Sequence, residues 1–408
     1  MSNGAVSTIV LGVGGGIAAY KVADLLRKLT ESGDDVTVVP TASALKFVGA
    51  ATWAALSHHP VSSDVWTGAD EVPHVQLGRN ADLVVVAPAT ADLIAKAAHG
   101  LADDLLTNTL LTARCPVLFV PAMHTEMWEH AATVENVATL RRRGVIVLEP
   151  ASGRLTGTDT GKGRLPEADE IARHCQLLLR RPDALPYDLA GMHVVVSAGG
   201  TREPLDPVRF LGNASSGKQG YALAAVAAAR GARVTLVAAN CELPDPAAVD
   251  VVRVGSAAEL RDAVHKAAAD ASVVVMAAAV ADFRPAAAQG HKIKKSDAGP
   301  PTIELEENPD ILLELVAKRR PGQVLVGFAA ETGDGDFSVL DHGRAKLARK
   351  GCDLLVVNAV GAGKAFGQAD NAGVILGSDG SETPVEYGPK ALLAAAVWDA
   401  VAALTTIS

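Results

Sequence analysis

Two segments of this chain share one pattern, a β-branched run that ends in glycines and leads into an alanine-rich helix. The first is Thr8-Ile-Val-Leu-Gly-Val-Gly-Gly-Gly16, and the second is His193-Val-Val-Val-Ser-Ala-Gly-Gly-Thr201. A strand that ends in this way lets the backbone approach a phosphate group, whose charge is favoured by the N-terminus of the following helix. The sequence therefore predicts two nucleotide-type sites, and with them two chemistries in one polypeptide.

The order of β-branched runs predicts an α/β protein with two Rossmann-like, doubly wound parallel-sheet domains in tandem. Strand-like runs alternate with helical stretches through residues 1–180, and the alternation restarts over residues 190–408. Residues 181–189 hold two prolines and no periodicity, which is typical of a linker. We expect a final helix over 390–405, and strands over 8–13, 36–40, 83–87, 117–120, 145–148, 193–197, 234–237, 249–254, 273–277, 324–328 and 354–358.

The composition excludes several classes of protein. Of the 408 residues 49% are hydrophobic and 20% are charged, which fits sheets buried on both faces. The net charge of -9 argues against sequence-independent nucleic-acid binding, and no uncharged apolar stretch reaches membrane-spanning length. The four cysteines form no Cys-x-x-Cys pair, and the N-terminus has no signal-peptide pattern. We expect a cytoplasmic protein with small-molecule partners.

The first glycine-rich loop fits a mononucleotide better than a dinucleotide. Its spacing satisfies G-x-G-x-x-A, but the second strand ends Val38-Val-Pro-Thr41 and lacks the acid that would hold a ribose hydroxyl. NAD is therefore disfavoured. A phosphate at the helix start fits better, with Thr41 and Ser43 as hydroxyl donors; a tight turn that binds nothing is the alternative.

Four segments of the first domain carry a family resemblance. They are Gly15-Gly-Ile-Ala-Ala-Tyr-Lys21, Pro73-His-Val75, Ala87-Pro-Ala-Thr-Ala-Asp92 and Pro121-Ala-Met-His-Thr-Glu-Met-Trp128. Together they resemble the flavin-dependent cysteine decarboxylases over about the first 175 residues. The resemblance implies that His74 is the catalytic base and that FMN is held by Gly15, Gly16, Ile17, Thr41, Ser43 and Thr90.

The chemistry of that family explains its need for a flavin and a base. A carboxylate beta to a thiol has no electron sink, so the flavin first oxidises the thiol carbon to a thioaldehyde. The thioaldehyde accepts the electrons released by loss of carbon dioxide, and the reduced flavin then returns a hydride. A histidine suits the proton removal, because its pKa lies near working pH.

Two residues depart from the family pattern. His124 stands where the substrate-binding segment, which also includes Met127, usually has asparagine, although an imidazole can still donate a hydrogen bond to the substrate carboxylate. Gly157 stands where the glycine-rich flap usually carries a cysteine, the proton donor of the final reduction. We therefore expect His124 or water to supply that proton.

The second domain contains a loop that imitates a P-loop. Gly212-Asn-Ala-Ser-Ser-Gly-Lys218 has the spacing G-x-x-x-x-G-K, but Gln219 replaces the magnesium-binding Ser or Thr and the preceding strand ends too early. What is left is a polar loop suited to phosphate or acyl-phosphate oxygens, with a generic helix start as the alternative. Further along, Lys292 and Lys294 project to one side of an extended segment, so that two ammonium groups can face a triphosphate.

The combination of this loop with later segments resembles the phosphopantothenate-cysteine ligases over nearly all of residues 190–405. These segments are Ala277-Ala-Ala-Val-Ala-Asp-Phe283, His291-Lys-Ile-Lys-Lys295, Asn308-Pro-Asp-Ile-Leu312, Gly327-Phe-Ala-Ala-Glu-Thr332 and Val357-Asn-Ala-Val360. The resemblance implies that CTP activates the carboxylate of 4'-phosphopantothenate as an acyl cytidylate, with Mg²⁺ or another divalent cation, before cysteine displaces CMP.

The same resemblance assigns roles to residues of the second domain. Lys292 is a catalytic cation, Asn213 holds the acyl cytidylate, and Asp282 also binds the metal. The CTP site comprises Gly199, Gly200, Ser215, Ser216, Ala279, Asp282, Phe283, Lys292, Lys294, Lys295 and Phe328. The pantothenate arm is assigned to Asn308, Asp310 and Asn358.

Both halves in this order resemble the bacterial bifunctional proteins of coenzyme A biosynthesis, which implies a phosphopantothenoylcysteine decarboxylase joined to a phosphopantothenate-cysteine ligase. One alternative is a flavin oxidoreductase fused to a nucleotide-dependent transferase, and another is a flavin-binding regulatory subunit. The resemblance also implies assembly, because the first family forms trimers and the second forms dimers. We expect a homo-oligomer that closes as a dodecamer.

Overall fold

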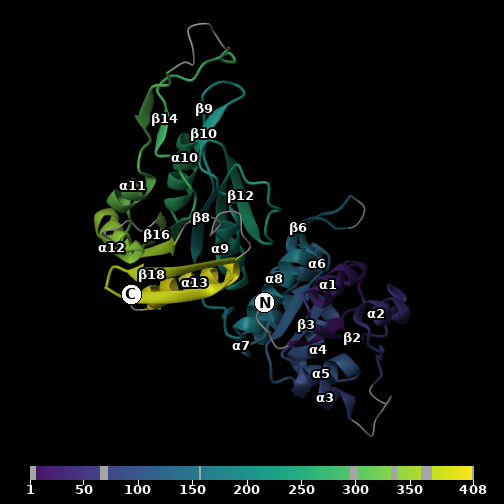
Figure 1. Ribbon diagram of the computed structural model, residues 1–408. Coiled ribbons are helices and arrows are strands. Elements are labelled where there is room, and N and C mark those ends of the chain that lie inside the picture. The colour runs from purple at the N-terminus through teal and green to yellow at the C-terminus, as the bar shows by residue number, and fades with distance from the viewer. Residues whose placement is uncertain are drawn as a thin grey trace. The chain divides into compact units, whose positions relative to one another are not determined.

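The computed structural model describes residues 6–64, 72–155, 158–294, 302–331, 338–359 and 370–406. It divides into two compact units, of which the first comprises Met1–Tyr187 with Pro246–Ala248 and the second comprises Asp188–Asp245 with Val249–Ser408. Each unit is a mixed α/β structure built on a largely parallel sheet (Figure 1). The predicted fold class is therefore confirmed.

The first unit is built on a five-stranded parallel sheet in the order β2-β1-β3-β4-β5. Its strands are β1 (Thr8–Val13), β2 (Asp35–Pro40), β3 (Leu83–Ala89), β4 (Val117–Pro121) and β5 (Ile146–Val147), with a separate hairpin of β6 (Ala151–Arg154) and β7 (Thr160–Arg164). Its helices are α1 (Ala19–Glu31), α2 (Ala50–Ser57), α3 (Pro73–Asn80), α4 (Ala91–His99), α5 (Leu105–Thr112), α6 (Thr125–Trp128), α7 (Ala131–Arg142) and α8 (Ala168–Arg180).

The strand order of the first unit determines where a ligand can bind. The chain passes from β1 to β2 on one side and then returns to β3 on the other side of β1. In open α/β sheets, ligands bind outside the carboxyl ends of the strands at the point where the order reverses. That point lies between β1 and β3, immediately before α1.

The second unit is built on an eight-stranded sheet in the order β12-β11-β8-β13-β16-β17-β18-β19. Its strands are β8 (His193–Gly199), β11 (Arg233–Ala239), β12 (Val249–Val254), β13 (Val273–Met276), β16 (Val324–Glu331), β17 (Leu354–Ala359), β18 (Asp370–Gly377) and β19 (Glu382–Pro389), with two small ribbons, β9 (Arg202–Pro204) with β10 (Phe210–Gly212) and β14 (Phe283–Pro285) with β15 (Leu305–Glu307). Its helices are α9 (Lys218–Ala229), α10 (Ala257–Ala268), α11 (Ile311–Lys318), α12 (Val339–Lys350) and α13 (Lys390–Thr406).

Every predicted strand is present in the two sheets, but four pairs of strands were not predicted. The antiparallel edge strands β18 and β19 extend the second sheet, and the two ribbons and the β6–β7 hairpin stand outside the sheets. Strand β19 contains two prolines and is exposed at most positions. Within sheets, proline is found only on edge strands and at bulges. Because β19 is an exposed edge strand, it lacks the continuous apolar run by which a buried parallel strand is predicted from sequence.

The C-terminal helix α13 packs on the second sheet, as predicted. Trp398 of α13 is fully buried, and its indole N–H donates a hydrogen bond of 2.9 Å to the carbonyl of Leu223 in α9. Helix α13 also packs against β16, β18 and β19. Among the described residues, no helix has both the length and the apolar character needed to span a membrane.

Arg230 joins three parts of the second unit and supports a prediction about its stability. The side chain is 1% exposed, and it donates hydrogen bonds of 2.8 Å to the carboxylates of Asp188 and Asp399. Arg230→Leu removes the hydrogen bonds that the guanidinium donates to Asp188, Asp399 and the carbonyl of Ala395, so it should lower the free energy of unfolding by about 3 kcal/mol. Urea unfolding of the full chain measures this change.

The matched control for that prediction is Arg233→Leu. Arg233 lies three residues further on, is 60% exposed and pairs with Asp270 at the surface. An exposed pair contributes little, so this control should change the free energy of unfolding by less than about 1 kcal/mol. Equal losses in the two variants would contradict the role assigned to Arg230.

Candidate active sites

Three loops meet at the reversal point of the first sheet. The backbone N–H of Gly14 donates a hydrogen bond of 3.2 Å to the carbonyl of Pro88, which joins the loop after β1 to the end of β3. A Cβ atom added to Gly15 would lie 2.3 Å from the Cβ of Ser43, so only glycine allows the loop after β1 to approach the loop after β2. The Cβ of a residue at position 16 would lie 3.6 Å from Thr90. The structure thus brings Gly15, Gly16, Ser43 and Thr90 together.

The hydroxyl groups around this cradle are held by their own loops. The Thr41 side chain is buried, and its oxygen accepts a hydrogen bond of 3.1 Å from the backbone N–H of Ala44. Thr90 caps α4 by accepting from the N–H of Leu93 at 3.3 Å. Ile17, by contrast, is 65% exposed at the entry to α1. The predicted FMN residues therefore form one polar cradle with an apolar side chain at its edge.

The loop after β4 adjoins this cradle and lies beneath the β6–β7 hairpin. The N–H of Ala122 donates to the carbonyl of Ala89 at 3.2 Å, and the N–H of Met123 donates to the carbonyl of Gly163 in the hairpin at 3.0 Å. His124 follows as the residue preceding α6, and Met127 in α6 is 47% exposed. The hairpin is the predicted flap, although Gly157 itself lies outside the described residues.

His74 lies on a different part of the first unit. It belongs to α3, which packs against α5, and its backbone carbonyl accepts a hydrogen bond of 2.7 Å from the hydroxyl of Thr112. Figure 1 shows α3 with α5 at one end of this unit and α6 with β6 at the other end. The imidazole Nδ1 is buried and has no hydrogen-bond partner within the described structure. A single chain therefore does not bring His74 alongside His124.

The second unit contains a cavity of about 900 Å³ at the carboxyl ends of β13, β16 and β17 and at the N-terminus of α9. The order of this sheet reverses between β8 and β13, so this is where a ligand is expected. Most of the residues predicted for the acyl cytidylate, for CTP and for the pantothenate arm line the cavity, namely Asn213, Ser215, Ser216, Ala279, Asp282, Phe283, Asn308, Asp310, Phe328 and Asn358.

Two asparagines fix the loop that follows β13. The amide of Asn213 donates a hydrogen bond of 2.9 Å to the carbonyl of Val280, and the amide of Asn308 donates to the carbonyl of Ala281 at 2.9 Å. The oxygen of Asn308 also accepts from Arg284 at 2.9 Å, so both ends of this amide are occupied. The side-chain oxygen of Asn358 is buried and has no partner among the described residues, which leaves it available to a ligand.

Gly199, the last residue of β8, and Gly200 shape the backbone and do not line the cavity. Gly199 has a φ of +85°, and a Cβ atom there would lie 2.0 Å from the carbonyl oxygen of Ala239. A Cβ atom on Gly200 would lie 2.5 Å from the carbonyl oxygen of Asn213. Both glycines therefore allow neighbouring backbone, the end of β11 at Gly199 and the Asn213 loop at Gly200, to approach closely.

Four lysines that the sequence analysis did not assign to a site line the same cavity, namely Lys218, Lys346, Lys350 and Lys390. Lys390 is 8% exposed and donates to the carbonyl of Asp370 at 3.3 Å; burial lowers the pKa of its ammonium group, and Lys218 lowers it further. Lys350 forms an ion pair with Asp310. Lys346 and Lys350 are four residues apart, so they share one face of α12. This four-residue spacing is the feature of the sequence from which Lys346 and Lys350 could have been predicted to act together.

The predicted lysine cluster lies elsewhere. Lys292 and Lys294 are exposed and are not among the residues that line the cavity, and Lys295 lies outside the described residues. Between them, Ile293 is hydrogen-bonded to the turn that joins β9 to β10. The described residues contain no group of three or more His, Cys, Asp or Glu side chains able to hold a metal ion. Asp282 therefore stands as a single candidate metal ligand.

Comparison with known proteins covers both units. The flavoprotein family model matches residues 2–179, and the model for the DNA/pantothenate metabolism flavoprotein C-terminal domain matches residues 189–404. The coenzyme A biosynthesis bifunctional protein CoaBC of Mycobacterium tuberculosis is 64% identical over 96% of each chain, and that of Bacillus subtilis is 41% identical over 97% of each chain. A crystal structure of the C-terminal domain of such a protein covers 54% of this chain and 100% of its own, with 33% identity and a TM-score of 0.46.

Proposed function

The chain belongs to the family of coenzyme A biosynthesis bifunctional proteins, and on this premise we propose that it converts 4'-phosphopantothenate and L-cysteine to 4'-phosphopantetheine. The second unit is the phosphopantothenate-cysteine ligase, and the first unit is the phosphopantothenoylcysteine decarboxylase. One observation carries this division, since each unit has its own polar site at the point where its strand order reverses. Each unit therefore has a place for a separate reaction.

The ligase reaction needs a leaving group and a site that stabilises negative charge. A free carboxylate does not react with an amine, so CTP first converts it to an acyl cytidylate and releases pyrophosphate. Lys218, Lys346, Lys350 and Lys390 line the cavity, and the N-terminus of α9 opens into it, so cations and backbone N–H groups would face the phosphates of bound CTP. Mg²⁺ binds mainly to substrate phosphates with one or two carboxylates, and Asp282 can serve as that carboxylate.

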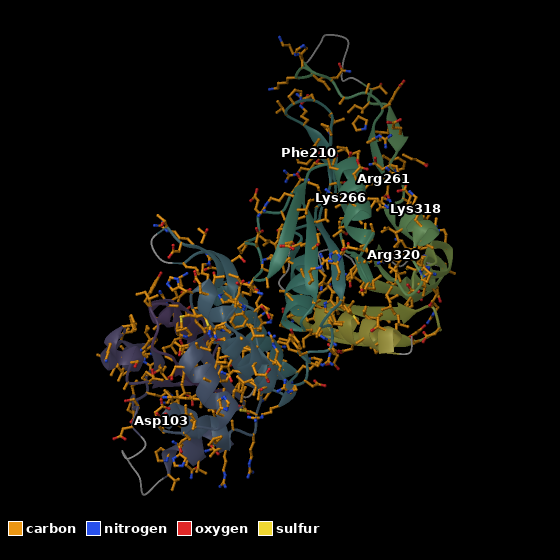
Figure 2. All side chains as sticks on the ribbon, turned by 180° about the vertical axis from the view of Figure 1, so that it is seen from behind. Asp103, Phe210, Arg261, Lys266, Lys318 and Arg320 are labelled. Carbon is orange, nitrogen blue, oxygen red and sulfur yellow. The ribbon has the colours of Figure 1, made fainter. Side chains whose placement is uncertain are left out.

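Lys292 and Lys294 are two further cations of the ligase unit, but they do not line the cavity of their own chain. The segment of Lys292 and Lys294 is held by the β9–β10 ribbon and its turn. This ribbon and turn carry three exposed apolar side chains, Val208, Phe210 and Leu211, of which Phe210 is labelled in Figure 2. Exposed apolar patches of this kind mark interaction surfaces. A twofold contact made through these ribbons would bring the lysines of one subunit to the cavity of its mate.

The decarboxylase site would hold FMN by the cradle of Gly15, Gly16, Thr41, Ser43 and Thr90. The close backbone approach at Gly15 and the surrounding hydroxyl groups fit a phosphate at the N-terminus of α1. When bound, the flavin supplies a two-electron acceptor for the thiol carbon of the substrate. The protein supplies His74 as the base, and its buried Nδ1 atom, which lacks a partner in the described residues, is ready to be oriented by substrate.

The positions of the site residues predict assembly. His74 lies on the α3–α5 side of the first unit, away from the loop that carries His124, so two chains are needed to bring both residues to one flavin. Threefold contacts between first units and twofold contacts between second units close as a dodecamer. Light scattering should give a mass of twelve chains of 41.8 kDa each. A monomer in solution would contradict this arrangement.

His124 supports a prediction about the last step of the decarboxylase. It precedes α6 beneath the flap, and one tautomer of its imidazole can donate a proton in place of the missing flap cysteine. Under anaerobic turnover, His124→Ala should slow the return of the oxidised flavin colour more than it slows release of carbon dioxide. Stopped-flow absorbance and carbon dioxide detection measure the two rates. Unchanged flavin reoxidation would assign the proton to water instead.

The visible absorption spectrum of the purified protein tests the first half of this proposal. The protein should carry the spectrum of oxidised flavin, and phosphopantothenoylcysteine should yield carbon dioxide without added nicotinamide cofactor. A flavin oxidoreductase would instead be bleached by NADH or NADPH and would release no carbon dioxide from this substrate. A regulatory subunit would bind flavin and turn over neither substrate.

A further inference from the structure

A buried carboxylate holds the segment that carries Lys292 and Lys294. The side chain of Asp206 is 0% exposed and lies in the turn between β9 and β10. Its Oδ2 atom accepts a hydrogen bond of 3.1 Å from the backbone N–H of Ile293, the residue between the two lysines. Its Oδ1 atom accepts from the N–H groups of Val208 and Arg209, each at 2.8 Å. One carboxylate thus connects the turn to the lysine segment.

Arg209 binds the other backbone polar group of Ile293, its carbonyl. Its guanidinium Nη2 donates a hydrogen bond of 3.2 Å to the carbonyl of Ile293. Earlier in the segment, the N–H of Gln289 donates to the carbonyl of Leu205 at 2.9 Å. Both polar groups of Ile293 are therefore engaged by side chains of one turn. Because the lysines flank Ile293, fixing this residue fixes the direction in which each lysine leaves the backbone.

The charge of Asp206 is maintained by its hydrogen bonds. Burial raises the pKa of its carboxyl group, but the three backbone N–H groups outweigh that effect, and the pKa lies below its ordinary value. A buried anion is unfavourable unless it is hydrogen-bonded. The bonds from Val208 and Arg209 already close the β9–β10 turn, so the bond from Ile293 serves the lysine segment and not the turn.

We infer that Asp206, together with Arg209, is a positioning residue of the ligase, which holds Lys292 and Lys294 in the orientation that meets the triphosphate. This inference rests on the proposed function, because it assumes that these lysines stabilise charge on CTP. Because the segment is already held, its backbone and the two long side chains lose less conformational entropy when CTP binds. Neither Asp206 nor Arg209 lines the cavity, so both act through the lysines.

The first test is Asp206→Asn in the full-length enzyme. The amide keeps the shape of the carboxylate, but its nitrogen cannot accept from the N–H groups that face it. We expect kcat/KM for CTP, measured by pyrophosphate release, to fall by about 10- to 100-fold, because small misplacements of a charge-stabilising group have effects of this size. Carbon dioxide release from supplied phosphopantothenoylcysteine should be unchanged.

Asp379→Asn is the matched control. Asp379 also stabilises a turn, between β18 and β19, by accepting a hydrogen bond of 2.9 Å from the backbone N–H of Ser381. It does not line the cavity, so this control should leave kcat/KM for CTP unchanged. Arg209→Ala is a gentler second variant, because its side chain is 49% exposed and the buried carboxylate is kept. It should give a smaller loss of the same kind, even where Asp206→Asn does not fold.

A double-mutant cycle separates positioning from general structure. In the Lys292→Ala, Lys294→Ala background, Asp206→Asn should cause less than about threefold further loss, because the groups that it positions are gone. The same fold-loss in both backgrounds would overturn the inference. If the lysine variant alone releases pyrophosphate at the wild-type rate, the proposed role of the lysines is wrong. If the lysine variant is slow while Asp206→Asn is fully active, only the positioning role is wrong.

Discussion

His74→Asn should bind flavin normally and release carbon dioxide from phosphopantothenoylcysteine at least about 100-fold more slowly than the wild type, because a positioned base contributes on this scale. The fold does not need the imidazole, since the buried Nδ1 atom makes no hydrogen bond with the described residues. The ligase reaction should proceed at its ordinary rate. Carbon dioxide release and flavin absorbance, measured on the same sample, check both parts.

His58→Asn is the matched control for this substitution. His58 is exposed at the end of α2 with a φ of +60°, a conformation that asparagine adopts readily. This control should retain flavin and both activities. A His74→Asn enzyme that decarboxylates as fast as His58→Asn would show that another residue is the base.

Lys292→Ala should lower the rate of acyl cytidylate formation by at least about 100-fold, because the proposed twofold contact brings this exposed cation to the cavity of the other subunit, where a cation aimed at developing charge has effects of this size. Pyrophosphate release in the absence of cysteine measures this half-reaction directly. Decarboxylation of supplied phosphopantothenoylcysteine should be unaffected, since it takes place in the other unit. Turnover with ATP as fast as with CTP would contradict the choice of nucleotide.

Lys318→Ala is the matched control in the ligase unit. Lys318 is exposed at the end of α11 and is not a cavity-lining residue (Figure 2). Its removal changes the net charge by the same amount as Lys292→Ala but should leave pyrophosphate release unchanged. If both variants lose the same fraction of activity, Lys292 acts only through the overall charge of the unit.

The sequence was most informative about buried parallel strands. A strand such as β3, whose residues Leu83–Ala89 are all buried, needs an unbroken apolar run, and that run is visible without a structure. The edge strand β19 is exposed at most positions and contains two prolines, so it lacks such a run. Edge strands are specified by pairing with a neighbour, which a single sequence does not reveal.

Some residues of the candidate sites could also be predicted from the sequence, and others could not. Residues in the glycine-rich loops and strand ends, such as Gly15 and Asp282, were visible because local spacing and the strand order place them at the reversal points. Lys346 and Lys390 were not singled out, because a lysine on a helix is ordinarily a solvated charge. Only the packing of α12 and α13 beside the strand ends brings them to the cavity.

Distant contacts were the hardest part to predict. The spacing of Lys292 and Lys294 predicts two ammonium groups on one side of an extended segment, but it gives no information on what holds that segment. The carboxylate that does so, Asp206, is 87 residues from Ile293 in the sequence. A contact over such a separation depends on the fold of the whole unit.

One measurement tests the central claim, that a single chain performs both reactions. The purified protein is given 4'-phosphopantothenate, L-cysteine, CTP and Mg²⁺, and CMP and carbon dioxide are followed together with the final thiol. We predict that CMP appears first, that carbon dioxide then forms in equal amount, and that 4'-phosphopantetheine accumulates. Formation of CMP without carbon dioxide, or no CMP at all, would contradict the account.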